Sequence, residues 1–132
     1  MCCVQFNPGQ RNPSVMWGDA HALRFSNATF GTVYVNVLDH ILGAEQFVEE
    51  AHRVLAARGT LFVDMDQNEP DEWTVRDLRE EREDLERLFD DHFERVSRIL
   101  IPKGEEKDAP KYSYVFRKRQ ATLFGSLGLG RR

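Results

Sequence analysis

The chain has 132 residues, 30% of them charged, and a formal net charge of -4 at pH 7. This length predicts one domain with a core of its own, and the negative charge argues against nonspecific binding to a phosphate backbone by the whole surface. No apolar run reaches the roughly 20 residues that span a bilayer, and the amino end lacks the basic and apolar regions of a signal peptide. Cys2 and Cys3 are neighbours that would point to opposite faces of a strand, so they are a poor disulfide pair. These features indicate a cytoplasmic protein with no membrane partner.

Two short apolar runs at the amino end are predicted to be strands. Residues 2–6 (CCVQF) are followed by the turn signal NPG, in which proline fixes one dihedral and glycine takes positive φ freely. Residues 14–17 (SVMW) are ended by Gly18 and Asp19.

The middle of the chain predicts a βαβ unit. Residues 30–37 (FGTVYVNV) are almost continuously apolar, which favours a strand covered on both faces, as in a parallel sheet. Residues 44–58 carry apolar side chains at helical spacing, with Gly59 placed as a left-handed carboxyl cap. The strand 60–65 (TLFVDM) follows at once, so strand, helix and strand form a right-handed crossover with parallel strands.

The last part of the chain predicts a surface helix and a hairpin. A polar loop at 66–73 leads to Thr74 and Asp77, whose spacing resembles a capping box for a helix over 75–91. Two further strands, joined by a charged loop, are expected to pair antiparallel; the strands cover 93–101 and 111–117, and the loop covers 102–109. We therefore expect one domain over 1–118 and a basic, glycine-rich tail over 119–132 that is disordered or loosely docked.

An ordered series of residues resembles a known enzyme family. The series runs GDAHAL from Gly18, then Phe25 and Phe30, VYVN from Val33, LDH from Leu38, and AHRVL from Ala51 with Gly59. It is similar to the class I S-adenosylmethionine-dependent methyltransferases, and most similar to their small-molecule branch known as methyltransferase type 11. The resemblance implies a truncated Rossmann-like α/β sheet, mostly parallel with a carboxyl-terminal antiparallel hairpin.

The resemblance also implies which family elements are present. Residues 2–6, 14–17, 32–37 and 60–65 would be the family's second to fifth strands. The family's first strand and the helix after it have no counterpart, and they carry the glycine-rich turn that lies against the methionine end of the cofactor. Where the second strand usually ends in an acidic residue that binds the ribose, this chain has Gln5 or Asn7. The family often has an aspartate at the entry to its fourth strand, and this chain has Gly31 at that position.

Of the family's cofactor site, the resemblance leaves this chain with the part that binds adenine. By resemblance, Asp19 would accept a hydrogen bond from the adenine amino group beside the Ala20 backbone, and Asn36 and Val37 would lie near the cofactor at the end of a strand. The implied cofactor is S-adenosylmethionine, bound weakly or conditionally. Asp19 after glycine is equally a natural turn residue, and both interpretations stay open.

Other polar residues are candidates either for a site or for a plain structural role. Asp39 and His40 follow a strand at the edge where open α/β sheets bind ligands, so they are candidates for the substrate side, although adjacent side chains usually diverge. His21 and His52 are expected to be surface residues, and the cysteines and histidines have no zinc spacing. The glycines of the tail, Gly125, Gly128 and Gly130, have no following helix that would support a phosphate loop.

Without the family's first strand, backbone edges and an apolar face would be exposed. Either residues 2–6 pair directly with 32–37, or another copy or partner chain supplies the missing edge, or the stretch before Gly18 is mobile; we predict the first or the second.

Two functions follow. The chain is a small-molecule methyltransferase, reduced or completed by a missing half, or it is a non-catalytic module that keeps the fold for binding or assembly. Nucleic-acid binding would rest only on the basic tail, through Lys118, Arg119, Arg131 and Arg132.

Overall fold

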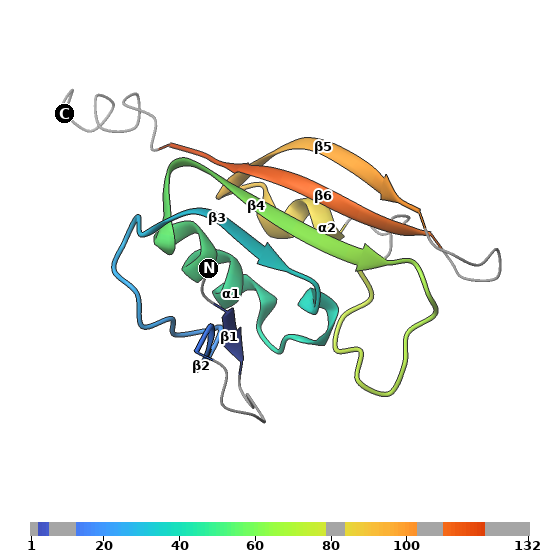
Figure 1. Ribbon diagram of the computed structural model, residues 1–132. Coiled ribbons are helices and arrows are strands. Elements are labelled where there is room, and N and C mark those ends of the chain that lie inside the picture. The colour runs from blue at the N-terminus through green and yellow to red at the C-terminus, as the bar shows by residue number, and fades with distance from the viewer. Residues whose placement is uncertain (1–2, 6–12, 79–83, 103–109, 121–132) are drawn as a thin grey trace, which may run out of the picture.

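The computed structural model describes residues 3–5, 13–78, 84–102 and 110–120 (Figure 1). Within them lie six strands, two α-helices and one short 3-10 helix. In chain order these are β1 (Cys3–Gln5), β2 (Val15–Trp17), β3 (Phe30–Val35), η1 (Leu38–His40), α1 (Ala44–Val54), β4 (Leu55–Asp66), α2 (Asp84–Phe89), β5 (Phe93–Ile101) and β6 (Lys111–Lys118).

The main sheet has four strands in the order β3-β4-β6-β5. β3 and β4 are parallel and are joined through α1, as expected for a βαβ unit. β6 pairs antiparallel with both β4 and β5, which confirms the predicted carboxyl-terminal hairpin. β1 and β2 form a separate parallel pair. The fold is thus the expected small α/β fold of truncated Rossmann-like type, with a mixed sheet.

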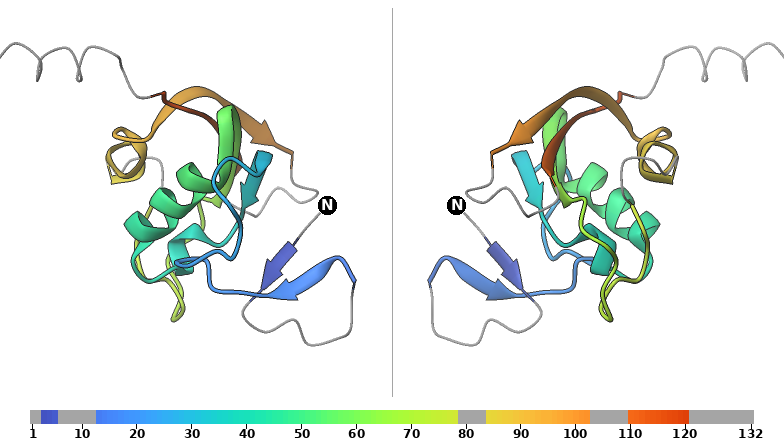
Figure 2. Two further views of the ribbon diagram at one scale, coloured as in Figure 1. Left: turned by 90° about the vertical axis from the view of Figure 1, so that its left-hand side faces the viewer. Right: turned by 90° about the vertical axis from the view of Figure 1, so that its right-hand side faces the viewer.

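Both helices lie on the same side of the sheet (Figure 2). α1 buries the apolar stripe that its periodicity predicts: Phe47, Val48, Ala51 and Val54 are at most 5% exposed. Beside it, Phe89 of α2 stacks on Phe116 of β6 with ring centroids 4.2 Å apart. Burial of these side chains between helices and sheet is the main stabilising term.

The end of α1 differs from the prediction. The helix stops at Val54 instead of residue 58, because Leu55 already pairs with Phe30 as the start of β4. The left-handed residue is Arg58, with φ of 60°, and the expected cap role of Gly59 is wrong. Gly59 has another constraint: a Cβ atom there would lie 2.9 Å from the carbonyl oxygen of Ala56. The backbone turn is too tight at this point for a side chain.

β3 is shorter and more exposed than the sequence predicts. It ends at Val35 instead of residue 37, and Tyr34 is 57% exposed, so coverage on both faces is wrong for the described residues. The direct pairing of residues 2–6 with the 32–37 strand is also wrong, since β1 pairs with β2 and the described partner of β3 is β4.

The predicted helix over 75–91 is wrong at its start. Residues 75–78 are not helical, because the backbone amides of Val75 and Arg76 donate to the Asp39 carbonyl instead of to a helix of their own. The Thr74 hydroxyl donates to Asp71 across a turn, so the capping box does not form. α2 is described only from Asp84. Residues 79–83, most of the loop at 102–109 and most of the tail lie outside the described residues.

Candidate functional site

A cavity lies where the parallel strands β3 and β4 end. Parallel strands bring their carboxyl ends to the same edge of a sheet, where open α/β folds bind ligands. The cavity has a volume of about 150 Å³. It is lined by residues from the end of β3, η1, the end of β4 and the loop after it: Asn36, Asp39, His40, Asp64, Met65, Asp66, Asn68, Glu69, Pro70, Asp71, Thr74, Arg76, Asp77 and Leu78.

The short helix η1 places Asp39 and His40 in this cavity. Leu38 beside them is fully buried and fixes the turn in the core. The carbonyl oxygen of Asp39 accepts hydrogen bonds from the amides of Val75 and Arg76, at 2.8 and 3.1 Å. One wall of the cavity, the segment after Pro70, is therefore attached to the η1 backbone.

The His40 imidazole faces two carboxylates. Its Nε2 lies 3.5 Å from Oδ2 of Asp39 and 3.7 Å from Oδ1 of Asp71. Adjacent side chains were expected to diverge, but the 3-10 turn brings Asp39 and His40 to the same side. Asp71 also accepts from the amide of Trp73, and this hydrogen bond lowers the pKa of the Asp71 carboxyl. The arrangement places an imidazole between two carboxylates at the edge of the cavity.

Six of the fourteen residues that line the cavity are acidic, which the sequence interpretation missed. Asp64, Asp66, Glu69, Asp71 and Asp77 join Asp39 there. A signal was present: a run of acidic residues directly follows the second of two parallel strands, at the edge where ligands bind.

Asp19 and His21 form a turn close to this edge. Oδ1 of Asp19 accepts from the His21 amide at 2.9 Å and lies 2.7 Å from His21 Nδ1. The His21 Nε2 contacts the carbonyl oxygen of Leu42, two residues after His40. The Leu42 carbonyl and then Asp19 raise the pKa of His21, and the His21 amide lowers the pKa of Asp19. Asp19 therefore has the turn role, and a second role toward adenine remains a prediction.

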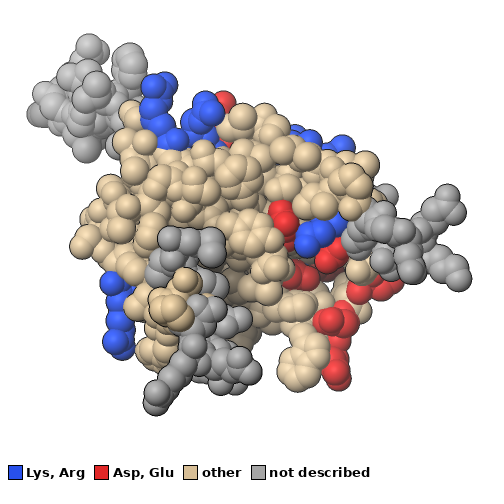
Figure 3. Space-filling model, viewed as in Figure 1, with Lys and Arg blue, Asp and Glu red and all other residues tan. Residues whose placement is uncertain are grey.

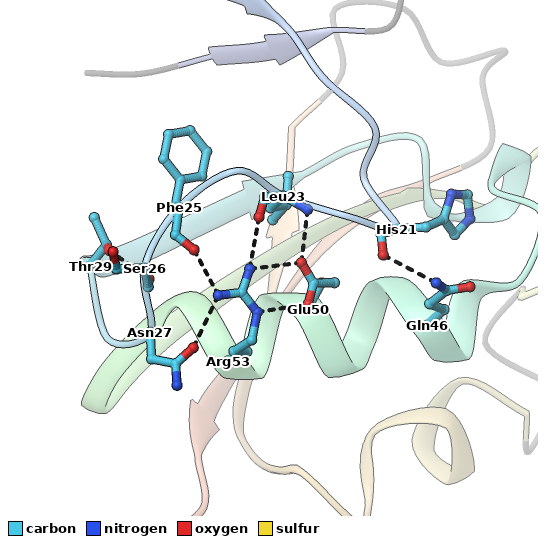
Figure 4. Close-up of polar contacts among 9 residues, drawn as sticks. All are labelled: His21, Leu23, Phe25, Ser26, Asn27, Thr29, Gln46, Glu50 and Arg53. Atoms are coloured by element: carbon cyan, nitrogen blue, oxygen red, sulfur yellow. Dashed lines mark hydrogen bonds and ion pairs between the residues drawn. The ribbon is translucent and has the colours of Figure 1, made fainter.

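Arg53 of α1 holds the loop that follows this turn (Figure 4). Its guanidinium donates to the carbonyl oxygens of Leu23 and Phe25, at 2.8 and 2.7 Å, and to the side chain of Asn27 at 3.0 Å. Two further hydrogen bonds join it to the Glu50 carboxylate, which itself accepts from the Leu23 amide. A planar guanidinium can satisfy all these acceptors at once. The Asp19 turn is thus positioned from the helix α1.

The predicted site residues fall into two groups. Asn36, Asp39 and His40 line one cavity, whereas Val37 is 47% exposed at the start of η1 and Ala20 packs partly buried against the core. In the described part of the chain, no group of three or more acidic, histidine or cysteine residues has metal-binding geometry. No helix among the described residues is long and apolar enough to cross a membrane.

Comparison with known proteins identifies the fold. Residues 3–63 match a family model described as a methyltransferase domain. The resemblance to class I S-adenosylmethionine-dependent methyltransferases is confirmed. The methyltransferase-like segment thus runs from β1 into β4 and includes the Asp19 turn, η1 and α1. A search of curated proteins found no match.

Solved structures share this methyltransferase fold at low sequence identity. A Burkholderia thailandensis 1,6-didemethyltoxoflavin-N1-methyltransferase, with 1,6-didemethyltoxoflavin and S-adenosylhomocysteine bound, has a TM-score of 0.66 at 15% identity, over 80% of this chain and 51% of its own. A methyltransferase of Methanosarcina mazei has a TM-score of 0.65 at 14% identity, over 82% and 68%. The cyclase SpnF has a TM-score of 0.64 at 16% identity, over 82% and 57%. The chain thus spans about half to two thirds of the length of these proteins.

Proposed function

We propose that this chain is a small-molecule methyltransferase domain that binds S-adenosylmethionine at the carboxyl edge of β3 and accepts its substrate in the adjoining cavity. The observation that carries the proposal is the cavity itself, which lies at the ends of two parallel strands and contains Asn36, Asp39 and His40. A bound small molecule and S-adenosylhomocysteine in a protein of the same fold support it.

The described residues fit one side of the cofactor. Asn36 offers an amide at the end of β3, and the exposed Val37 offers an apolar surface beside it. A cavity of about 150 Å³ is smaller than the roughly 300–1,000 Å³ of most ligand sites. It therefore suits a small acceptor, while the cofactor would lie mainly on exposed surface. Binding to the isolated chain is expected to be weak, or to depend on further polypeptide.

When bound, S-adenosylmethionine supplies an electrophilic methyl group, and an acceptor that carries a proton must lose it. His40 is the residue placed to take this proton through Nε2, which lies 3.5 Å from Oδ2 of Asp39 and 3.7 Å from Oδ1 of Asp71. The acidic lining also disfavours acceptors with a negative charge. The chain's remaining contribution is to hold the acceptor in place and exclude water.

Calorimetric titration with S-adenosylhomocysteine tests the binding step. We expect a dissociation constant of about 1 mM or tighter, which corresponds to about -4 kcal/mol. Asp19→Ala should weaken binding about tenfold if the carboxylate contacts adenine. Asp90→Ala, at an exposed position after α2, is the matched control.

The turn role of Asp19 can be separated from a binding role. His21→Ala removes the other half of the turn but leaves the carboxylate in place. Equal losses in Asp19→Ala and His21→Ala would assign Asp19 to the turn alone. Absence of heat at millimolar ligand in every variant would leave the methyltransferase proposal without support.

The alternative is a non-catalytic module, and the cyclase of the same fold illustrates that fold alone does not fix the reaction. Release of S-adenosylhomocysteine in the presence of a panel of small acceptors distinguishes the two. We expect His40→Gln to bind the cofactor product normally and to lose at least about tenfold in turnover. Cofactor binding without turnover of any acceptor would favour the module.

A further inference from the structure

The two faces of the main sheet differ in what covers them. Leu61 and Val63 of β4 and Phe116 of β6 point toward the helices and are at most 1% exposed. Because side chains alternate along a strand, the residues between them point to the other side. In Figure 2 the described helices lie on one side only. The opposite side of the sheet therefore has no described helix over it.

A row of apolar side chains crosses this uncovered side. Tyr34 of β3 pairs directly with Phe62 of β4, and Phe62 pairs with Val115 of β6. Ile99 of β5 lies in the next row, opposite Ser113. Tyr34 is 57% exposed and Ile99 52% exposed. We call these four residues, Tyr34, Phe62, Val115 and Ile99, the open face.

Where β4 and β6 pair, the charges on the side of the sheet that carries the open face balance, although the chain has a net charge of -4. By strand alternation, Asp64 and Asp66 of β4 and Lys111 and Arg117 of β6 lie on this side. The carboxylate nearest the open face, Asp64, accepts a hydrogen bond from the Tyr34 hydroxyl at 2.9 Å, and Lys111 Nζ lies 3.9 Å from the same oxygen. Figure 3, viewed as in Figure 1, shows a broad area over β3, β4 and β6 with few charged side chains. Charge repulsion therefore does not prevent two such faces from meeting.

This charge pattern selects among partners. A two-fold interface brings a surface against its own copy, so it must be nearly uncharged or self-complementary. The open face meets that condition, whereas a strongly charged partner would find no net opposite charge there. We propose that the open face is the contact surface of a homodimer in which two copies of this chain pack sheet against sheet.

The proposed contact agrees with the physics of sheet packing. Two sheets pack face to face about 10 Å apart, with their side chains interdigitated. The row of Tyr34, Phe62 and Val115 would then lie in the dry centre of the interface. The cavity at the ends of β3 and β4 would remain open at the edge of the sheet, so dimerisation and ligand binding can be measured separately.

Sedimentation equilibrium of the full chain over a range of concentrations tests the proposal. We expect a mass that rises to twice 15.3 kDa. Ile99→Glu should weaken dimerisation at least about tenfold, because it buries a charge at the interface. Leu42→Glu is the matched control, since Leu42 is an aliphatic residue 72% exposed outside the open face.

Circular dichroism confirms that each variant is folded, and Ile99→Ser replaces Ile99→Glu if the charged variant unfolds. A mass of 15.3 kDa at every concentration would overturn the proposal. This holds even if a different protein binds the open face, because the proposal is a homodimer. A dimer that withstands both changes at Ile99 would overturn it as well.

Discussion

β1 with β2 and β3 with β4 are both parallel strand pairs, but β2 is far more exposed than β3 and β4. Val35, Leu61 and Val63 are at most 7% exposed, whereas Met16 and Trp17 of β2 are 40% and 51% exposed. The difference between the pairs is α1, which connects β3 to β4 and covers one of their faces. Strand pairing alone stabilises little, because a two-stranded unit is marginal without a buried face.

The contrast implies two levels of stability in one chain. The body, which we define as β3 to β6 with η1, α1 and α2, contains almost every buried apolar residue of the described chain. β2 is expected to exchange its amide hydrogens faster than the body, because its side chains are partly or largely exposed and local opening there uncovers little apolar surface.

Two alanine substitutions, one in the body and one in β2, test this difference in stability most directly. Phe116→Ala in β6 removes a ring that stacks on Phe89, and should lower the free energy of unfolding by about 3–5 kcal/mol. Met16→Ala in β2 should lower it by less than about 0.5 kcal/mol, as at other exposed positions. Urea denaturation measures both. A loss above about 2 kcal/mol for Met16→Ala would mean that β2 is packed as firmly as the body.

Much of this contrast could be predicted from the sequence. The helical spacing of Phe47, Val48, Ala51 and Val54 indicated the covered face, and the apolar residues at 93–101 and 111–117 indicated the hairpin. The ordered motif from Gly18 to Gly59 identified the fold, since the family model matches residues 3–63.

The rest depended on contacts between distant segments. α1 ends at Val54 because Leu55 pairs with Phe30, a register that local propensity does not contain. The helix expected from residue 75 is replaced by hydrogen bonds from Val75 to the Asp39 carbonyl, 36 positions away by residue number (75 minus 39). The same contacts enclose the cavity, so its acidic lining could not be assembled from the sequence in order.

Two glycines within the body, one in β3 and one in β4, are expected to differ in their tolerance of a side chain. Gly59→Ala would place a Cβ atom 2.9 Å from both the Ala56 carbonyl oxygen and Leu55 Cδ2, and should destabilise by about 1–3 kcal/mol. Gly31→Ala in β3 meets no atom within 4 Å and should change stability by at most about 1 kcal/mol, in the stabilising direction. Thermal unfolding compares the two. Equal effects would show that the Gly59 turn relaxes to admit the methyl group.

Arg53 connects the body to the loop after β2. Its removal should therefore loosen that loop and leave the body unchanged. Arg53→Lys loses the forked geometry that reaches Leu23, Phe25 and Asn27. We expect faster hydrogen exchange at the amides of Leu23 and Ala28, with little change in β4 and β6. Arg53 also lowers the pKa of Glu50 below its ordinary value of 4.5. This stabilisation is therefore fully present above pH 4.5 and is lost as the pH falls through the lowered folded pKa. Uniform exchange over the whole chain in Arg53→Lys would contradict a local role.

The smallest predicted effect is that of His21, which links the Asp19 turn after β2 to Leu42 before α1. Its pKa is raised above the ordinary histidine value of 6.5, so its contribution is complete below that pH and is lost as the pH rises through the folded pKa. The pKa of Asp19 is lowered from the ordinary aspartate value of 3.8, so the carboxylate contributes above that pH and its contribution is lost as the pH falls through the folded pKa. This link should thus be strongest between these two ordinary values. Because Asp19 is half-exposed and His21 partly exposed, we expect His21→Ala to lower Tm by only about 1–3 °C near pH 5.5, and by less at about pH 8.5. A difference in Tm that stays constant over this range would assign His21 a packing role instead of an electrostatic one.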